Sequence, residues 1–340
     1  MKNLPAFKTL IGKLEQSPLF YLFLSSRELF HTNFWFWLSK LNPEETIKLF
    51  SNTILSSQTG FFREYNQRYV EEKSQVDLLI TDKGVPAIVI ENKVKDFPTT
   101  EQLDRIKTTF SQSSPEFVLT TLFWSDELQF TGWAVKTYRQ ISEQLTPENF
   151  TKDSYYKSLI QDYKGFTLNL AELAELLPIT HDYDFAKAHN KVLFDQLNSI
   201  KLWEGFQKLR ASHLLLHFTK ANTHQVKATY RINNQKVTIQ FLVPIDKGYN
   251  MGIQIEDNQY RKFIFGPKHE QFADNLQQNH IFFDPAWLSP QKKNMCGYKP
   301  DFKYQYEKLL PMSFNQLFAK INADIEQINT NWKQIYNLLP

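Results

Sequence analysis

The chain has 340 residues, with 39 Lys and Arg against 36 Asp and Glu, so its formal net charge is +3. That length allows one large domain or two ordinary ones. Hydrophobic residues make up 42% and charged residues 22%, close to globular averages, which excludes a wholly disordered chain. The single cysteine, Cys296, excludes a disulfide framework and a cysteine-rich zinc site.

Targeting signals and nucleotide-binding loops are also missing from the sequence. The first 16 residues, MKNLPAFKTLIGKLEQ, lack the apolar core of a secretory signal, and nowhere do 18 apolar residues run uninterrupted. We therefore expect a cytoplasmic protein without a membrane span. Neither GxGxxG nor GxxxxGK[ST] occurs, which argues against nucleotide binding of those kinds.

The first half of the chain combines helical and strand patterns. Residues 5–56 have a helical pattern, which includes a strongly apolar helix over residues 25–40. Strand patterns follow at 60–69, 75–81 and 85–94. A helix then begins near residues 98–99 and passes through 101–110, and further strands are expected at 117–123 and 133–138. This β-β-β-α-β-β order predicts an α/β fold whose central mixed sheet is flanked by helices.

The second half predicts an α+β region. A helical stretch at 152–177 ends the first predicted domain, residues 1–177, and residues 178–183 read as a connection. In the second predicted region, residues 184–340, a helix at 202–218 precedes strands at 225–232, 236–243, 249–256 and 260–265, and a long amphipathic helix covers 313–339. The sequence leaves open whether the two regions pack as one body.

Residues 75–104 hold the most informative chemistry. Two apolar strands flank the turn Asp82-Lys83-Gly84. If the hairpin is centred near Lys83-Gly84, the numbers of paired residues sum to about 168, so Asp77 faces Glu91. Strand alternation then puts Glu91 and Lys93 on one face of the sheet.

Opposed carboxylates in apolar strands repel each other and need a cation. Lys93 is one candidate, and a divalent metal is the other. Two carboxylates with backbone carbonyls and water form the oxygen shell that Mg²⁺ accepts, and a lysine beside it can orient attacking water. The alternative is a salt-bridge network of Asp77, Glu91 and Lys93, and the pattern alone does not decide between the two.

The string Asp77-x13-Glu91-Asn92-Lys93, with Gln102 in the next helix, resembles the PD-(D/E)XK nuclease superfamily. It is most similar to a bacterial branch with an ELFH[ST]NF helix and an IENK strand, which appear here at residues 28–34 and 90–93, joined by Arg-Glu-Tyr at 63–65. The resemblance covers roughly residues 15–140. Val76 stands where the superfamily signature has proline.

The resemblance implies a restriction-endonuclease-like core and metal-dependent hydrolysis of phosphodiester bonds, with DNA favoured over RNA. It implies that Asp77 and Glu91 bind Mg²⁺ or Mn²⁺, with the Asn92 backbone carbonyl as a third ligand and Lys93 as the catalytic lysine. A homodimer is compatible with such a nuclease, and phage defence or mobile-element biology would be its setting. The alternative function is a catalytically silent protein of the same fold that binds nucleic acid or a protein partner.

Four further residues are considered for the same site. The resemblance implies that Glu28 orders the metal or its water, and that Gln102 lies near the scissile phosphate. Both residues also fit capping boxes, Ser25-x-x-Glu28 and Thr99-x-x-Gln102. His31 follows Glu28 at i+3 on the same helical face, so it is a candidate catalytic residue or a hydrogen-bonded core histidine. Glu64 either joins the site or pairs with a basic neighbour.

The second region offers weaker signals. His213 and His217 have i,i+4 spacing without the glutamate of an HExxH motif, so we read them as core or surface residues. Aromatic and basic residues alternate in two of the predicted strands, at Tyr230, Arg231, Tyr260, Arg261 and Lys262. They are either a nucleic-acid-binding face or the outward positions of a β-meander.

Overall fold

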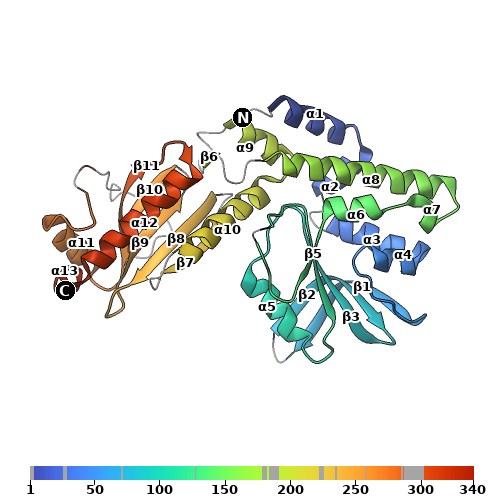
Figure 1. Cartoon of the computed structure of the whole chain (residues 1–340), viewed down its shortest axis with the longest axis horizontal. Helices are drawn as coiled ribbons and strands as arrows, with labels where there is room; N and C mark the ends of the chain where they lie inside the picture. Colours follow the sequence, from blue (N-terminus) through green and yellow to red (C-terminus); the bar gives the residue numbers. More distant parts are fainter. Residues whose placement is uncertain are drawn as a thin grey trace. The chain divides into compact units, whose positions relative to one another are not determined.

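The computed structural model describes residues 4–25, 29–69, 72–126, 128–177, 182–183, 191–221, 226–233, 236–256, 258–284, 286 and 302–340. The chain divides into two compact units (Figure 1). The first comprises Met1–Leu177 with Ile200–Phe206, and the second comprises Pro178–Ser199 with Gln207–Pro340. Within the described residues, no helix combines the length and the apolar character needed to cross a membrane.

The first unit begins with four helices: α1 (Leu4–Glu15), α2 (Pro18–Ser25), α3 (Leu29–Leu41) and α4 (Pro43–Lys48). The helix predicted over 25–40 corresponds to α3, which the structure describes from Leu29 onward. Ser25 ends α2, and its hydroxyl donates to the Leu22 carbonyl at 2.8 Å, which places Ser25 at the end of one helix instead of at the N-cap of the next.

A mixed five-stranded sheet follows, with the strands in sequential order. Its strands are β1 (Thr59–Tyr69), β2 (Glu72–Asp82), β3 (Val85–Lys93), β4 (Glu116–Thr121) and β5 (Ala134–Thr137). The pairs β1–β2 and β2–β3 are antiparallel, whereas β3–β4 and β4–β5 are parallel. Helix α5 (Thr100–Thr109) connects β3 to β4. The predicted α/β class and the β-β-β-α-β-β order are thus confirmed.

The β2–β3 hairpin has the predicted register. Leu78 pairs with Ile90, and Ile80 pairs with Ile88, so the numbers sum to 168 until the register shifts between Ile80 and Thr81. Lys83 and Gly84 have φ of 51° and 79°, both in the left-handed region that a tight hairpin turn requires. This register fixes the level of Asp77 relative to the end of β3.

Helices cover both faces of this sheet. Helix α5 packs on one face through a hydrophobic cluster made of Val76, Leu79, Val89, Leu103, Ile106, Phe110, Leu119 and Trp133. Helix α3 lies against the other face, α6 (Tyr138–Gln144) contacts β5, and α8 (Ser154–Glu175) packs on α6 as an outer layer (Figure 1). The short helix α7 (Pro147–Phe150) joins α6 to α8. The apolar residues of the central strands β2, β3 and β4 are therefore largely buried on both faces of the sheet.

The second unit is built on an antiparallel sheet with the order β11-β10-β9-β8-β7. Its strands are β7 (Lys227–Asn233), β8 (Lys236–Pro244), β9 (Asn250–Glu256), β10 (Gln259–Phe265) and β11 (Phe302–Lys308), and two short strands, β6 (Asp182–Tyr183) and β12 (Met312–Ser313), pair separately. The four strands predicted for this region are confirmed.

Helices α9 (Lys191–Ser199), α10 (Trp203–Ala221), α11 (His269–Gln278), α12 (Phe314–Thr330) and α13 (Trp332–Asn337) complete the described elements. Helix α12 buries Leu317, Ile321, Ile325 and Ile328, spaced at three to four residues, in the cluster that also holds the inner residues of β8 and β9. The single helix predicted over 313–339 is two helices, because α12 ends at Thr330 and Asn331 separates it from α13.

Candidate active site

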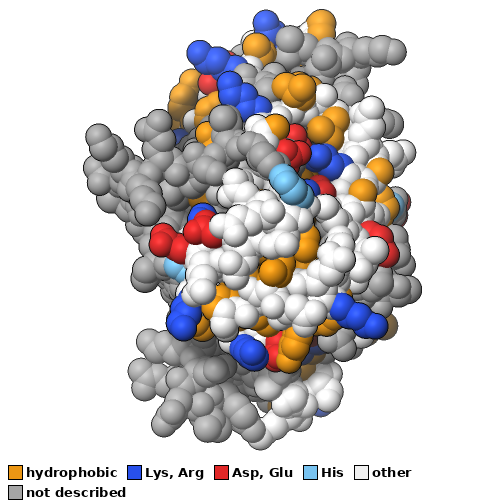
Figure 2. All heavy atoms as spheres, turned by 90° about the vertical axis from the view of Figure 1, so that its left-hand side faces the viewer, with side chains coloured by type: hydrophobic (Ala, Val, Ile, Leu, Met, Phe, Trp, Pro, Cys, Tyr) orange, Lys and Arg blue, Asp and Glu red, His pale blue; other side chains and the backbone are white. Residues whose placement is uncertain are grey.

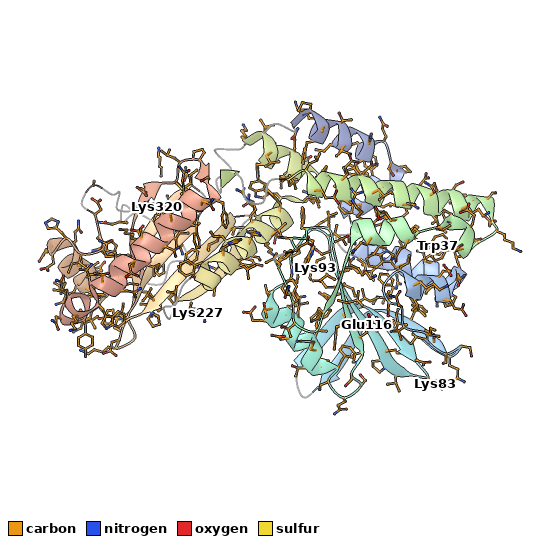
Figure 3. The ribbon with its side chains drawn as sticks, in the orientation of Figure 1. Trp37, Lys83, Lys93, Glu116, Lys227 and Lys320 are labelled. Carbon is orange, nitrogen blue, oxygen red and sulfur yellow. The ribbon has the colours of Figure 1, made fainter. Side chains whose placement is uncertain are left out.

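Charged and polar residues occupy the end of β3 in the interior of the first unit. Ile88 and Ile90 are fully buried, and Glu91, Asn92 and Lys93 follow with exposed fractions of only 3%, 0% and 9%. In Figure 3, Lys93 lies toward the end of β3 that is remote from the hairpin turn at Lys83. A buried strand that ends in two charges and an amide needs specific partners for each of them.

Asp77 supplies the first of these partners. The paired register of β2 and β3 ends at Leu78 and Ile90, and at the next position Asp77 Oδ2 accepts a hydrogen bond from the backbone N–H of Asn92 at 2.7 Å. The carboxylate of Asp77 thus takes the place of a backbone acceptor. As predicted, the acidic residues Asp77 and Glu91 come from neighbouring strands at one level of the sheet.

Glu91 and Lys93 share a face of β3, as the alternation of strand side chains predicts. Lys93 Nζ lies 2.9 Å from Glu91 Oε1, and Gln102 Nε2 donates to the same oxygen at 2.8 Å. Burial by itself would lower the pKa of Lys93. The Glu91 carboxylate outweighs this effect, and with the charges of Asp77 and Asp96 it raises the pKa of Lys93 above its usual value.

Gln102 takes part both in the cap of α5 and in the candidate site, the two roles that the sequence allowed. The Thr99 hydroxyl accepts from the backbone N–H of Gln102 at 3.2 Å, so Thr99 caps α5 as predicted. The Gln102 side chain instead reaches the Glu91 carboxylate. The backbone N–H of Gln102 therefore takes part in the cap of α5. The side-chain amide of Gln102 contacts Glu91 and belongs to the candidate site.

The Asn92 carbonyl lies on the same side of β3 as Asp77. The Lys93 carbonyl accepts from the backbone N–H of Leu122 at 2.9 Å, and the Glu91 carbonyl lies 3.3 Å from Thr120 Oγ1, so both carbonyls face the β4 side. Successive carbonyls alternate in direction along a strand, and the Asn92 carbonyl between them faces β2. Oxygen atoms of Asp77 and Asn92 are thereby directed to one edge of β3.

His31 does not join this group. It lies on α3 with no exposed surface, its Nδ1 is 2.9 Å from the Tyr163 hydroxyl, and its ring packs edge-on against Tyr138. Burial, and then the charge of Lys95, hold the pKa of His31 well below its usual value. This placement is on the face of the sheet opposite Glu91 and Lys93, and it fits the alternative of a core histidine.

Two charged residues beside the site had not been singled out from the sequence. Lys95 is 8% exposed, donates to the Phe23 carbonyl near the end of α2, and lies over the Phe23 ring at 4.2 Å. The charge of Asp96 acts on Lys93. The signal in the sequence was the charged run Asn92-Lys93-Val94-Lys95-Asp96 directly after a buried strand.

Two other predicted participants are described in part or not at all. Glu28 lies outside the described residues. The β1–β2 register pairs Arg63 with Leu78 and Tyr65 with Val76, so Glu64 lies level with Asp77 on the adjacent strand. The side chain of Glu64 is outside the described part of the chain.

The aromatic and basic residues of β10 are not on a binding surface. Tyr260, Arg261 and Lys262 are at most 6% exposed, which corrects both interpretations of these three residues. Tyr260 donates to Asp324 Oδ2, and Lys262 forms an ion pair with Asp324 Oδ1, each at 2.8 Å. Asp324 belongs to helix α12, which covers these residues. On the face shown in Figure 2, the described Lys and Arg side chains are interspersed with acidic and hydrophobic ones instead of forming one positive surface.

His213 and His217 were expected to be either core or surface residues, and the structure places both on α10 in contact with an aromatic ring. Their rings lie 4.7 Å apart on α10, and both pack edge-on against Phe314, at 5.6 and 5.2 Å. His213 is buried and His217 half-buried, and both rings pack against the first residue of α12.

Among the described residues, no three His, Cys, Asp or Glu side chains are grouped so as to hold a metal ion. Asp77 and Glu91 nevertheless offer two carboxylates, and the Asn92 carbonyl adds a third hard oxygen. Mg²⁺ usually binds through one or two carboxylates and keeps several waters, so this donor set fits it. Comparison of the chain with protein-family models, curated proteins and solved structures finds no match.

Proposed function

We propose that this protein is a metal-dependent nuclease of the PD-(D/E)XK type that hydrolyses phosphodiester bonds, with DNA as its substrate. The observation that carries the proposal is the convergence of three residues at the end of β3, where Asp77 in the middle of β2 lies beside Glu91 and Lys93. Asp77 and Glu91 lie at one level on adjacent strands, and Lys93 contacts Glu91 at 2.9 Å. Two acids and a lysine at the motif spacing are the minimum that this chemistry needs.

The roles follow from the donor atoms. Asp77, Glu91 and the Asn92 carbonyl would hold Mg²⁺ or Mn²⁺, which when bound supplies Lewis-acid stabilisation of the phosphate and lowers the pKa of water. The ammonium group of Lys93 would stabilise negative charge on the phosphate oxygens during attack. The Gln102 amide orients the Glu91 carboxylate from α5.

The architecture of the first unit is compatible with this proposal. A mixed five-stranded sheet carries the three residues on two adjacent strands, and helices cover both faces. We propose that residues 1–177 form a restriction-endonuclease-like core. The acidic pair then lies at the end of the hairpin opposite the turn, where the β2–β3 ladder stops at Leu78 and Ile90.

Cleavage of supercoiled plasmid DNA with Mg²⁺ or Mn²⁺ tests the proposal. Asp77→Ala and Lys93→Ala should each lower the cleavage rate by at least about 100-fold, because each removes a charged group from the reaction. Lys83→Asn is the matched control, since it removes a lysine from the hairpin turn, and asparagine tolerates the positive φ there. Folding of each variant is checked by circular dichroism. Undiminished cleavage by Asp77→Ala and Lys93→Ala would refute the assignment.

One observation favours a different interpretation. Lys93 and Gln102 both contact Glu91 Oε1, as they would in a structural salt bridge without catalysis. A protein of that kind, which binds nucleic acid or a partner through the same fold, would take up no Mn²⁺ at Asp77 and Glu91. Calorimetric titration with Mn²⁺, with and without DNA, separates it from the nuclease.

A further inference from the structure

Asn92 stands between two residues of the candidate site, but its side chain points to the opposite face of the sheet. Asn92 Oδ1 accepts from the Tyr138 hydroxyl at 2.7 Å and from the Thr120 hydroxyl at 3.0 Å. Its Nδ2 donates to Thr32 Oγ1 across 3.4 Å. The carboxamide therefore connects β3 to β4, to α6 and to α3 at the one residue that separates Glu91 from Lys93.

The groups that hold this carboxamide are themselves fixed by packing. Thr32 and Thr120 have no exposed surface, and Tyr138 is 1% exposed. The Tyr138 ring packs edge-on against His31 at 4.8 Å, and Trp35 lies 5.8 Å away. Tyr138 is also the first residue of α6, whose N-terminus is closed by a complete capping box at Thr137. The hydroxyl that binds Asn92 is thus held by a rigid part of the first unit.

The Asn92 side-chain contacts lie where β3 has lost its pairing with β2 and keeps only its parallel pairing with β4, which continues through Lys93. The β2–β3 pairing ends at Leu78 and Ile90, and beyond it the Asn92 N–H is held by the side chain of Asp77. A strand end that is paired along one edge only, here with β4, can twist about that edge unless a further contact fixes it. The Asn92 carboxamide supplies that contact from the face opposite the site.

We propose that Asn92 is a positioning residue, and that its carboxamide, held by Tyr138 and Thr120, sets the orientation of the Glu91 carboxylate and of the Asn92 carbonyl toward a bound cation. The proposal rests on the proposed function for the identity of the ligand. Outer partners of metal ligands typically change metal affinity by 10- to 100-fold when they are removed. Asn92 differs from such partners in holding the ligands through the backbone of β3.

The test compares two variants that each remove one buried hydroxyl from the same face of the sheet. Tyr138→Phe removes the hydroxyl that binds Asn92. Tyr163→Phe removes the hydroxyl that binds His31, and leaves the Asn92 contacts with Tyr138, Thr120 and Thr32 in place. Both variants should lower the melting temperature, because each removes one hydrogen bond from a buried side chain. Stability alone therefore does not distinguish positioning from packing.

Two other measurements do distinguish them. Tyr138→Phe should weaken Mn²⁺ binding by about 10-fold in calorimetry without DNA, and lower kcat with KM for DNA unchanged, whereas Tyr163→Phe should keep the Mn²⁺ affinity of the original protein. Hydrogen exchange of a peptide covering residues 88–95 should accelerate in Tyr138→Phe and not in Tyr163→Phe.

The outcomes separate this inference from the proposed function. Equal exchange rates at residues 88–95 in the two variants would overturn the positioning role, whatever the protein cleaves. Unequal exchange in a protein that neither binds Mn²⁺ nor cleaves DNA would keep the mechanical role of Asn92 and refute the nuclease.

Discussion

Asp77 lies one position beyond Leu78 in the last β2–β3 pair, and its Oδ2 accepts a hydrogen bond at 2.7 Å from the backbone N–H of Asn92, two positions beyond Ile90. A side chain thus continues the connection between two strands where the backbone ladder stops. The Asn92 N–H and carbonyl both face β2, so the same carboxylate that holds the strand lies beside an oxygen that a cation can bind. Asp77 consequently has a structural contribution and a proposed ligand role, and substitutions can separate them.

Asp77→Asn and Asp77→Ala should differ in the stability of the protein measured with a chelator present. Asparagine keeps an acceptor for the Asn92 N–H and removes the repulsion between Asp77 and Glu91, so the free energy of unfolding should stay equal or rise. Alanine removes the acceptor and should cost about 1–2 kcal/mol. Urea denaturation measures both. A loss for Asp77→Asn as large as that for alanine would support the structural salt bridge instead.

Gln102→Ala and Thr99→Ala should separate the cap of α5 from the site. Thr99→Ala removes the N-cap and should cost about 1 kcal/mol of stability, with no change in Mn²⁺ affinity. Gln102→Ala leaves the backbone cap and removes the contact with Glu91 Oε1, so it should weaken Mn²⁺ binding by about 10-fold. Calorimetry with thermal melting gives both quantities. An equal effect of the two variants on Mn²⁺ binding would exclude Gln102 from the site.

The buried His31 should make the protein sensitive to acid. The pKa of His31 is lowered in the folded state. Below about pH 6.5, His31 is therefore protonated in the unfolded chain and still neutral in the folded protein. Stability attributable to His31 should fall as pH drops below about 6.5, by at most about 1.4 kcal/mol per pH unit, and should level off below its folded-state pKa. His31→Gln keeps a polar partner for Tyr163 and should show a smaller loss between pH 7 and 5. If the free energy of unfolding fell equally with pH in the original protein and in His31→Gln, His31 would not be the source of the acid sensitivity.

Lys262 should stabilise the second unit without contributing to DNA binding. Lys262→Met leaves the half-buried Asp324 without its cation, which should cost about 1–3 kcal/mol, and Asp324→Leu in the same chain should restore part of it. Arg231→Ala is the exposed control, with an expected change within about 0.5 kcal/mol. Chemical denaturation and fluorescence anisotropy with labelled DNA measure the two properties. Lost DNA affinity in a folded Lys262→Met protein would restore the nucleic-acid-face hypothesis for β10.

Features that depend only on residues close together in the chain could be predicted from the sequence. The turn at Lys83-Gly84 determined the register of the hairpin, and the register determined that Asp77 and Glu91 lie level. Alternation along β3 then determined that Glu91 and Lys93 share a face. Each of these steps depends on a local period or on one tight turn, so no distant residue could change it.

Features that depend on distant residues were not predictable in the same way. Lys262 is buried because Asp324, 62 residues later, lies on the helix that covers β10. The amide of Gln102 had two geometrically sound partners, and the tertiary contact with Glu91 prevailed over the local cap. The contact between Asn92 and Tyr138 joins residues 46 positions apart, and nothing in the motif Ile-Glu-Asn-Lys indicates it.

Diffraction from crystals soaked in Mn²⁺, recorded where manganese scatters anomalously, tests most directly whether Asp77 and Glu91 form a metal site. The proposed site predicts an anomalous peak about 2.0–2.4 Å from oxygen atoms of Asp77, Glu91 and the Asn92 carbonyl, with Lys93 moved away from Glu91 Oε1. An intact contact between Lys93 and Glu91 at saturating Mn²⁺, with no peak beside Asp77, would contradict it.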